Sequence, residues 1–336
     1  MRVLMTGGAG FLGRRVVQRL LAGGASVRCL LRRPSALDDL RGPGVDLEIV
    51  EGSLAGIGPG SDLARGCEVV VHAAADLRGG TAGMFLTNVV ATRGLIEAAG
   101  RSGVSRLVLV SSLGVYGTGH LRAGQALDET CPLDPEPHRR DPYTYSKVAQ
   151  ERAAWSALAA GTVPLVVVRP SVIYGPGRDP ITGRVGLRLG GFLLGMGGRH
   201  RLPYIYVDNC AEGVALAATA PAPGVEGEAF DLVDDELPTG RQVLRAHRRA
   251  VGGVRAVWVP RPAIGALSRF SQWYHRASRG QLPAVLTPYK SDAQWKPLRY
   301  PNAKAKRWLG WSPAVGLAEG MKRTTEALAR PTARGA

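Results

Sequence analysis

The chain has 336 residues, of which 45% are hydrophobic and 21% charged, a composition typical of a folded protein with one large α/β domain and a smaller lobe. The formal net charge is +16, but the basic residues are mostly arginines spread along the chain, and no nucleic-acid-binding module is recognisable, so no nucleic-acid partner is expected. No apolar run is long enough to span a membrane, no signal peptide is evident and the four cysteines are scattered, which favours a reducing cytoplasm and no metal site.

The first residues predict a dinucleotide-binding unit. An apolar strand at 2–6 is followed by the glycine segment GGAGFLG and by a helix at 14–24. In such units the three glycines allow a tight turn, approach of the backbone to a pyrophosphate and close packing of the helix. We assign these roles to Gly7, Gly10 and Gly13. The helix N-terminus beside Phe11 and Leu12 favours the negative charge of a phosphate.

The end of the next strand, 26–33, bears on the choice of cofactor. NAD-binding units usually place an acidic residue there, about twenty residues past the glycines, to bind the ribose 2′-hydroxyl. This chain has Arg32 and Arg33 instead. A guanidinium suits a 2′-phosphate, so we expect NADP(H), with NAD(H) as the alternative if both arginines are only solvated surface residues.

Further apolar strands alternate with helices along the chain. Strands are predicted at 47–50, 68–75, 106–112 and 164–170, with a notable helix at 87–103. This pattern predicts an α/β fold, a Rossmann-type doubly wound parallel sheet with a smaller C-terminal substrate lobe. We expect a dinucleotide-binding domain at 1–175 to which 205–235 returns, a substrate-binding lobe at 176–204 and 236–330, and a flexible tail at 331–336.

The segment DPYTYSKVAQE at 141–151 holds a candidate acid/base. Asp141 and Pro142 predict a helix start, as N-cap and first-turn proline. Tyr143 and Lys147 are then four residues apart on one face, whereas Tyr145 points roughly to the opposite side. A nearby ammonium would lower the pKa of the Tyr143 phenol and make it a better general acid/base.

Eight motifs, in order along the chain, resemble the extended short-chain dehydrogenase/reductase superfamily, also called NAD-dependent epimerase/dehydratases. The similarity is closest to the 3β-hydroxysteroid-dehydrogenase-like and dihydroflavonol-reductase-like members. The motifs are TGGAGFLG (6–13), HAAA (72–75), NVVATRGLIEAA (88–99), VSSLGVYG (110–117), PYTYSK (142–147), RPSVIYGPG (169–177), IYVDNCAEGVALA (205–217) and KAKRWLGWSP (304–313).

The resemblance implies roles for individual residues. Tyr143 would be the catalytic acid/base, Lys147 would bind the nicotinamide ribose, Ser112 would hold the substrate oxygen, and Asn88 would support the lysine through water. Ser53 stands where many members have an aspartate near the adenine. Further cofactor contacts are implied for Leu54, Ala73, Ala74, Ala75, Pro170, Ser171 and Val172. Substrate contacts are expected from Ser112, Leu113, Tyr143 and Tyr174.

Two departures favour a reductase within this superfamily. Leu113 and Gly114 replace the Asp–Glu pair of sugar-nucleotide dehydratases and cannot move protons. Val172 replaces an asparagine that many sugar-nucleotide epimerases use. We expect an NADPH-dependent enzyme that interconverts a ketone and a secondary alcohol on a mainly apolar small molecule, such as a steroid, flavonoid, polyketide or β-keto acid. The alternatives are a nucleotide-sugar epimerase or ketoreductase with tightly bound NAD(P), a non-catalytic NADP-binding sensor, or recruitment to non-redox chemistry.

The segment 261–286 mixes aromatic residues with arginines. It could wall a substrate pocket, belong to the core of the lobe, or form a basic amphipathic helix with weak contact to a membrane surface or an acidic carrier protein. By resemblance, the chain is expected to form a homodimer through the helix of Tyr143 and Lys147.

Overall fold

The computed structural model describes residues 1–58, 60–77, 79–196, 198–221, 224–278, 281 and 286–330. A seven-stranded sheet in the order β11-β6-β5-β4-β1-β2-β3 forms its centre, and all neighbouring strands are parallel. The strands are β1 (Arg2–Thr6), β2 (Ser26–Leu31), β3 (Leu47–Glu51), β4 (Val69–His72), β5 (Arg106–Val110), β6 (Leu165–Pro170) and β11 (Glu228–Leu232). The predicted Rossmann-type fold is confirmed; the predicted tail at 331–336 lies outside the described residues.

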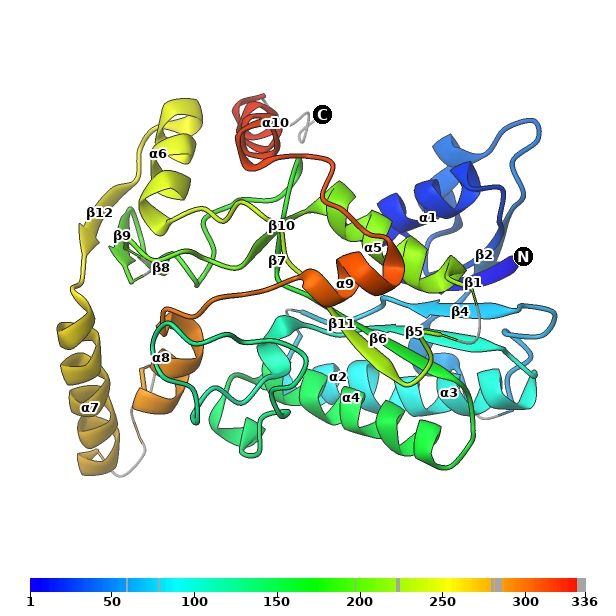
Figure 1. Cartoon of the computed structure of the whole chain (residues 1–336), viewed down its shortest axis with the longest axis horizontal. Coiled ribbons are helices and arrows are strands. Elements are labelled where there is room, and N and C mark those ends of the chain that lie inside the picture. The colour runs from blue at the N-terminus through cyan, green and yellow to red at the C-terminus, as the bar shows by residue number, and fades with distance from the viewer. Residues whose placement is uncertain are drawn as a thin grey trace.

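Helices cover both faces of this sheet (Figure 1). One face carries α1 (Gly13–Ala22) and α5 (Val207–Thr219); the other carries α2 (Thr81–Phe85), α3 (Ala91–Arg101) and α4 (Pro142–Ala159). Alternate residues of β1 enter different clusters: Val3 is buried together with Leu20 of α1, and Leu4 together with Leu95 of α3. Burial on both faces explains why the strands read as continuous apolar runs.

Some predicted boundaries were wrong where the chain approaches the functional site. β4 ends at His72 and β5 at Val110, earlier than predicted, because the residues that follow turn to line a cavity. The single helix predicted at 87–103 is instead a π-helical turn at Leu86–Val90 followed by α3, and α2 precedes the turn. Such π turns often occur at functional sites.

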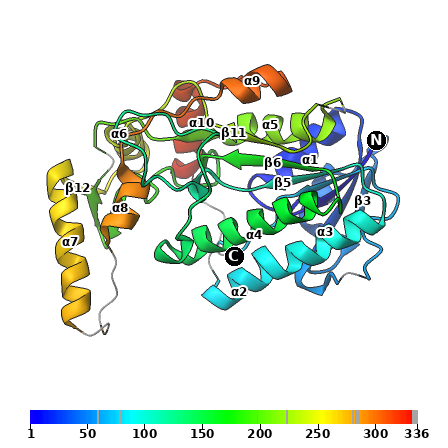
Figure 2. The same cartoon turned by 60° about the horizontal axis from the view of Figure 1, so that its bottom comes forward.

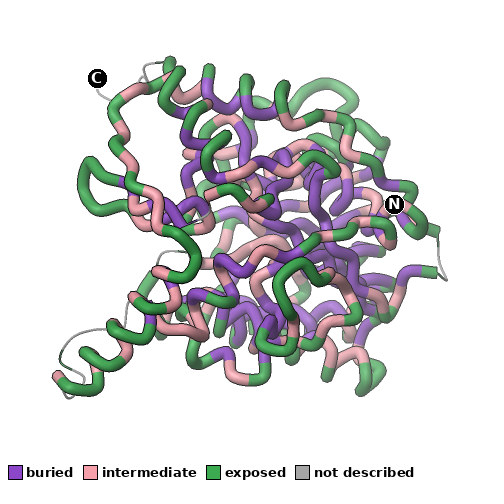
Figure 3. The backbone as a smooth tube through the Cα atoms, turned by 60° about the vertical axis from the view of Figure 1, so that its left-hand side comes forward, coloured by how far each residue is buried: buried purple, intermediate pink, exposed green. Residues whose placement is uncertain are grey.

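A second group of elements lies at one end of the sheet (Figure 2). It contains the pair β7 (Val172–Tyr174) and β10 (Tyr204–Tyr206), a three-stranded sheet of β8 (Gly186–Leu189), β9 (Phe192–Gly195) and β12 (Arg255–Trp258), and α6 (Gly240–Val251), α7 (Arg261–Ala277) and α8 (Pro288–Trp295). Between these, the chain returns to the large sheet: β11 pairs with β6 and α5 packs on α1, which supports the expected return of 205–235. α9 (Ala303–Leu309) and α10 (Leu317–Ala329) follow. Buried residues concentrate around the large sheet, whereas the outer surface of this second group is largely exposed (Figure 3).

A buried ion pair joins α4 to the large sheet. Glu151 of α4 is fully buried and pairs with Arg169 of β6. The Ser111 hydroxyl donates to Glu151 at 2.6 Å, and Arg169 donates to the Tyr116 hydroxyl at 2.6 Å. The Tyr116 hydroxyl in turn donates to Asp231 of β11 at 2.8 Å. The network thus fixes α4 against three strands.

Replacing Glu151 by Ala is expected to destabilise the protein by about 3–5 kcal/mol, because it leaves the buried Arg169 without its counter-ion. Denaturant unfolding of the variant and the natural protein measures this difference. Glu319→Ala, which breaks the half-exposed pair with Arg323, is the control and should leave the unfolding midpoint unchanged. Equal effects of the two changes would contradict the assigned role of the buried pair.

Candidate active site

A cavity of about 1170 Å³ runs along the carboxyl edge of the large sheet. This edge is where open α/β sheets bind ligands. Every residue predicted to bind the cofactor lines the cavity: Gly7, Gly10, Phe11, Leu12, Gly13, Arg32, Arg33, Ser53, Leu54, Ala73, Ala74, Ala75, Tyr143, Lys147, Pro170, Ser171 and Val172. Ser112 also lines it. The chain therefore brings together segments from the ends of six strands that are distant in sequence.

The glycine segment forms a cradle that side chains would fill. Gly7 has a φ of +78°, and a Cβ there would lie 2.6 Å from the backbone nitrogen of Ala74. A Cβ on Gly13 would lie 2.0 Å from the Gly7 carbonyl oxygen, so only glycine lets α1 pack this closely. No acidic residue and no side-chain cap occupies the first turn of α1. The backbone N–H groups of Phe11, Leu12 and Gly13 have no hydrogen-bond partner among the described residues, so they are available for a phosphate. These features fit a dinucleotide pyrophosphate.

The end of the cavity beside β2 and β3 is positively charged. Arg32 and Arg33 directly follow β2, are exposed and line the cavity. Ser53 lines the same end, where its hydroxyl accepts a hydrogen bond from the Ala55 N–H at 3.4 Å. None of the described residues from β2 and β3 that line this end is acidic. The charge here therefore suits an anionic group on the ribose.

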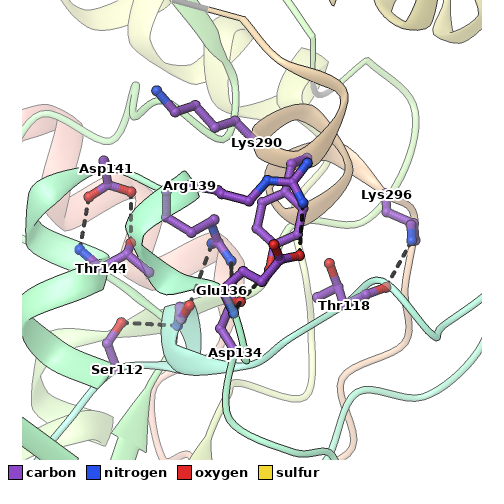
Figure 4. A network of polar contacts seen from close by, with 12 residues as sticks. Ser112, Thr118, Asp134, Glu136, Arg139, Asp141, Thr144, Lys290 and Lys296 are labelled. Carbon is purple, nitrogen blue, oxygen red and sulfur yellow. Dashed lines mark hydrogen bonds and ion pairs between the residues drawn. The ribbon is translucent and has the colours of Figure 1, made fainter. Parts of the chain in front are cut away.

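The start of α4 is held as the sequence predicts. The Asp141 carboxylate accepts from the Thr144 N–H at 2.9 Å and from the Thr144 hydroxyl at 2.7 Å (Figure 4). This cap directs Tyr143 and Lys147 into the cavity. Tyr145 is 37% exposed and instead packs edge-on against Phe85, with ring centroids 4.8 Å apart. Helical geometry therefore places Tyr143, and not Tyr145, on the cavity wall, while the role of Tyr143 as acid/base stays a prediction.

The pKa of Tyr143 differs from the expectation. Burial, and then Asp141, raise the Tyr143 pKa from 10.0 to about 12, against the lowering effects of Arg178 and of a hydrogen bond with Ser112. Lys147 is not among the groups that shift this pKa, because its Nζ donates to the Val110 carbonyl at 2.8 Å and to the Gln150 amide oxygen. The prediction that Lys147 lowers the Tyr143 pKa is therefore wrong.

A buried polar network holds Lys147. The Gln150 side chain accepts from Lys147 and donates to the Thr92 hydroxyl at 2.8 Å. His72 lies between the hydroxyls of Thr6 and Thr92, 2.7 Å from each. Burial, and then the Lys147 charge, lower the His72 pKa to about 3, so its imidazole is neutral and can relay hydrogen bonds without adding charge. The network links the lysine to the end of β1, where the glycine cradle begins. Sequence reasoning missed Gln150, although its position three residues after Lys147 places it on the same helical face.

Asn88 is a buried positioning residue and does not line the cavity. It lies in the π-helical turn, and its side chain donates to the Ser146 hydroxyl at 2.9 Å. Its amide oxygen accepts from the Asp76 N–H at 2.7 Å, and Ser146 donates to the Tyr143 carbonyl at 2.8 Å. Asn88 thus joins the segment after β4 to the first turn of α4. Its direct side-chain hydrogen bonds go to Asp76 and Ser146, and the expected support of Lys147 through water stays a prediction.

Two predicted substrate contacts are not in the cavity wall. Leu113 is buried in a cluster with Tyr116 and Val233. Tyr174 is 1% exposed and packs against the rings of Tyr204 and Tyr206, at centroid distances of 5.7 and 5.5 Å. β7 and β10 bury these tyrosines together, so the assignment of Leu113 and Tyr174 to substrate contact is corrected.

The segment after β7 supplies residues that sequence reasoning did not identify. Arg178, Asp179 and Thr182 line the cavity. The Arg178 guanidinium lies over the Phe11 ring, 4.7 Å from its centroid, and its charge lowers the pKa of Tyr143. A cation therefore acts on the candidate acid/base, but it comes from a loop rather than from the lysine. An arginine directly after the YGPG motif was the available signal.

A polar cluster ties the second group of elements to the cavity wall (Figure 4). Asp134 is fully buried and accepts from Arg140 at 2.8 Å, from the Glu136 N–H at 3.0 Å and from the Tyr289 hydroxyl of α8. Arg139 pairs with Glu136 and lies over the Tyr289 ring, 4.3 Å from its centroid. The loop before α4 is thereby fixed to α8. This arrangement couples the position of Tyr143 to the smaller group of elements.

Curated relatives match nearly the whole chain. A 3 beta-hydroxysteroid dehydrogenase/Delta 5-->4-isomerase of Mycobacterium tuberculosis is 30% identical, over 93% of this chain and 86% of the relative. A 2-alkyl-3-oxoalkanoate reductase of Stenotrophomonas maltophilia is 29% identical, over 96% of this chain and 98% of the relative. A 4-hydroxy-2-methyl-3-oxo-4-farnesyl-3,4-dihydroquinoline-1-oxide ketoreductase of Stigmatella aurantiaca is 29% identical, over 100% of this chain and 98% of the relative.

Solved structures share the fold. UDP-glucuronic acid 4-epimerase from Bacillus cereus, in complex with UDP-glucuronic acid and NAD, superposes with a TM-score of 0.72 at 19% identity, over 98% of this chain and 99% of that one. Residues 3–232 match the model of the NAD dependent epimerase/dehydratase family. With this match and the named relatives, the chain belongs to the NAD dependent epimerase/dehydratase family and is an NAD(P)-dependent oxidoreductase.

Proposed function

We propose that this enzyme uses NADP(H) to interconvert a ketone and a secondary alcohol on a mainly apolar small molecule. The observation that carries the proposal is the position of Ser112, Tyr143 and Lys147 on the wall of the cavity that also contains the glycine cradle. Relatives named for steroid, oxoalkanoate and farnesylated quinoline substrates support an apolar substrate.

The residues of the cavity suit this reaction. Tyr143 would transfer the proton at the substrate oxygen, and the Ser112 hydroxyl, which hydrogen-bonds Tyr143, would hold the same oxygen. Lys147, whose pKa burial lowers to about 8, would orient the cofactor and keep a positive charge nearby at neutral pH. When bound, the nicotinamide supplies or accepts the hydride. Leu113 and Gly114 offer no acid or base for dehydration.

Turnover of a carbonyl panel tests the proposal. Purified protein with NADPH should reduce at least one ketone among steroids, flavonoids and β-keto acids or esters. The main alternative is a nucleotide-sugar epimerase, whose fold the solved structures share. NAD that survives purification, together with epimerisation of a UDP- or dTDP-sugar and no net ketone reduction, would overturn the proposal in favour of this alternative.

The double variant Arg32→Ser/Arg33→Ser is expected to lower kcat/KM for NADPH by about tenfold to a hundredfold, because each charged hydrogen bond to a 2′-phosphate contributes roughly 1.5–3 kcal/mol. The kcat/KM for NADH should change little, since NADH lacks the 2′-phosphate. Initial rates with both cofactors measure the ratio. Arg65→Ser, another exposed arginine outside the cavity, is the control. An unchanged NADPH/NADH ratio in the double variant would refute a role in cofactor choice.

We also propose that the enzyme is cytoplasmic and forms a homodimer through the face of α3 and α4. Leu86, Val90 and Tyr145 are exposed apolar or aromatic residues on or beside these helices, with exposed fractions of 58%, 56% and 37%. Covering them would remove apolar surface from water. Light scattering coupled to size exclusion measures the mass in solution.

In the part of the chain that the structure describes, no helix is long and apolar enough to span a bilayer.

A further inference from the structure

The positive charge of the chain is concentrated in one region. Between Leu237 and Ser291 the sequence contains nine arginines and one lysine but no aspartate or glutamate. This region comprises α6, β12, α7 and the start of α8. These elements follow one another along one edge of the molecule, farthest from β3 and the N-terminus (Figures 1 and 2). The edge is therefore basic although basic residues occur throughout the chain.

α7 carries an aromatic stripe that no described part of the chain covers. Phe270, Trp273 and Tyr274 have exposed fractions of 59%, 61% and 50%. Phe270 contacts both other rings, at centroid distances of 5.8 and 6.2 Å. The buried face of the helix, with Ile264 and Ser268, points to α8 and the adjoining core. The stripe is thus a second apolar face, separate from the one that stabilises the fold.

Arginines border this stripe. Ala266 and Ala277 extend it at spacings of three to four residues, so it runs along most of the helix. Arg269 and Arg276 are exposed and lie about two helical turns apart, on one flank of the aromatic residues. The helix has no acidic residue. Its outer surface therefore combines large amphipathic rings with cations on long side chains.

α6 adds further cations on the same edge. Arg241, Arg245, Arg248 and Arg249 are exposed and line a groove of about 330 Å³ together with Trp258 of β12. The Arg241 guanidinium lies over the Trp258 ring, 5.5 Å from its centroid. No carboxylate of the described residues forms an ion pair with these four arginines or with Arg255, Arg261, Arg269 and Arg276. The positive charge of this edge is not neutralised within the fold.

We infer that α7 and the arginines of α6 form a binding surface for an anionic phospholipid membrane. Tryptophan and tyrosine favour the headgroup region, where their rings contact acyl chains and their polar groups stay hydrated. Arginines beside them reach the phosphates on long side chains and strengthen attachment to an anionic surface. A protruding helix with an apolar stripe and a basic flank can lie in the plane of such an interface.

Charge argues against the other occupants of this face. A second copy of the chain would bring the same arginines together across a symmetric contact, without acidic partners on this edge. An acidic protein would neutralise the arginines. It would also need a pocket complementary to the three exposed aromatic rings on this projecting helix. A bilayer with anionic headgroups satisfies both the charge and the apolar stripe. The inference does not depend on the proposed reductase activity.

Sedimentation with vesicles tests the inference. The full chain should bind vesicles of phosphatidylcholine that contain about one-third phosphatidylglycerol, bind pure phosphatidylcholine vesicles much less, and be released by high salt. Phe270→Ser/Trp273→Ser/Tyr274→Ser and Arg269→Glu/Arg276→Glu should each reduce the partition coefficient by about tenfold or more. Arg65→Glu/Arg122→Glu, with the same change of charge at two exposed arginines outside α3, α4, α6 and α7, is the matched control and should bind nearly as well as the natural chain.

Other outcomes would overturn the inference. If both double charge reversals weaken binding equally, the attraction is due to net charge alone. If the aromatic variant binds as well as the natural chain, α7 does not enter the interface. Loss of self-association in the aromatic variant, measured by sedimentation velocity without vesicles, would instead assign the stripe to a contact between copies of the chain. Far-ultraviolet circular dichroism and thermal unfolding of each variant establish that it is folded.

Discussion

Replacing Tyr143 by Phe is expected to lower kcat/KM for carbonyl reduction by about a hundredfold to ten-thousandfold, the range that a general acid contributes. The change removes one oxygen and keeps the ring that lines the cavity. The carbonyl oxygen then gains negative charge without a proton donor, and Ser112 alone must stabilise it. Steady-state rates with the best ketone and saturating NADPH measure the loss.

Tyr145→Phe is the matched control for this prediction. The same atom is removed two residues away, on a side chain that is 37% exposed and packs against Phe85 outside the cavity. Its kcat/KM should stay within about twofold of the natural enzyme, since surface changes away from the site have small effects. Cofactor affinity, measured by NADPH fluorescence, should be similar in both variants. Equal losses of activity would refute the assignment of Tyr143.

The same pair of variants separates an enzyme from a non-catalytic sensor. A sensor would keep its function when Tyr143 loses its hydroxyl, because binding of a dinucleotide does not need a proton donor at that position. A catalyst loses turnover while cofactor binding persists. A variant that retains turnover but loses NADPH affinity would contradict both expectations and would make Tyr143 a cofactor contact only.

The fold was predictable because local and long-range signals agree. Each strand of the large sheet is buried on both faces, so it appears in the sequence as a continuous apolar run between turn residues. Positions 7 and 13 need glycine because a Cβ there would collide with nearby backbone atoms. Such a need is visible in a single sequence as a glycine motif. The cap by Asp141 follows from local chemistry alone.

The parts of the site that were missed depend on tertiary contacts. Whether Tyr174 faces a ligand or the core depends on β10, which packs Tyr204 and Tyr206 against it and follows about thirty residues later in the chain. The position of Arg178 over Phe11 depends on a loop whose path has no periodic signal. Side-chain direction also decided the pKa of Tyr143: Lys147 lies one turn away, as predicted, but its ammonium is directed to Val110 and Gln150.

Replacing Lys147 by Met is the second change with a large expected effect. It should lower kcat/KM by about a hundredfold or more, because the variant lacks the cation that would orient the cofactor beside Tyr143. In the natural enzyme, NADPH affinity should fall as pH rises through about 8, where Lys147 loses its proton. The variant should show weak affinity without this pH dependence. Lys322→Met on α10, an exposed lysine, should retain both the activity and the pH dependence.

Stability provides an independent test of the same lysine. Burial lowers the pKa of Lys147 from 10.5 to about 8, so between these values the unfolded chain binds more protons than the folded one. The contribution of Lys147 to the free energy of unfolding is therefore fully present above pH 10.5 and is lost as pH falls through about 8. Relative to Lys147→Met, the natural protein should gain up to about 3 kcal/mol over this window. Comparison of the two proteins cancels the titration of the buried tyrosines. If the difference in free energy of unfolding between the two proteins does not change with pH, Lys147 keeps an ordinary pKa. Loss of its proton would then not explain a pH dependence of cofactor binding near pH 8.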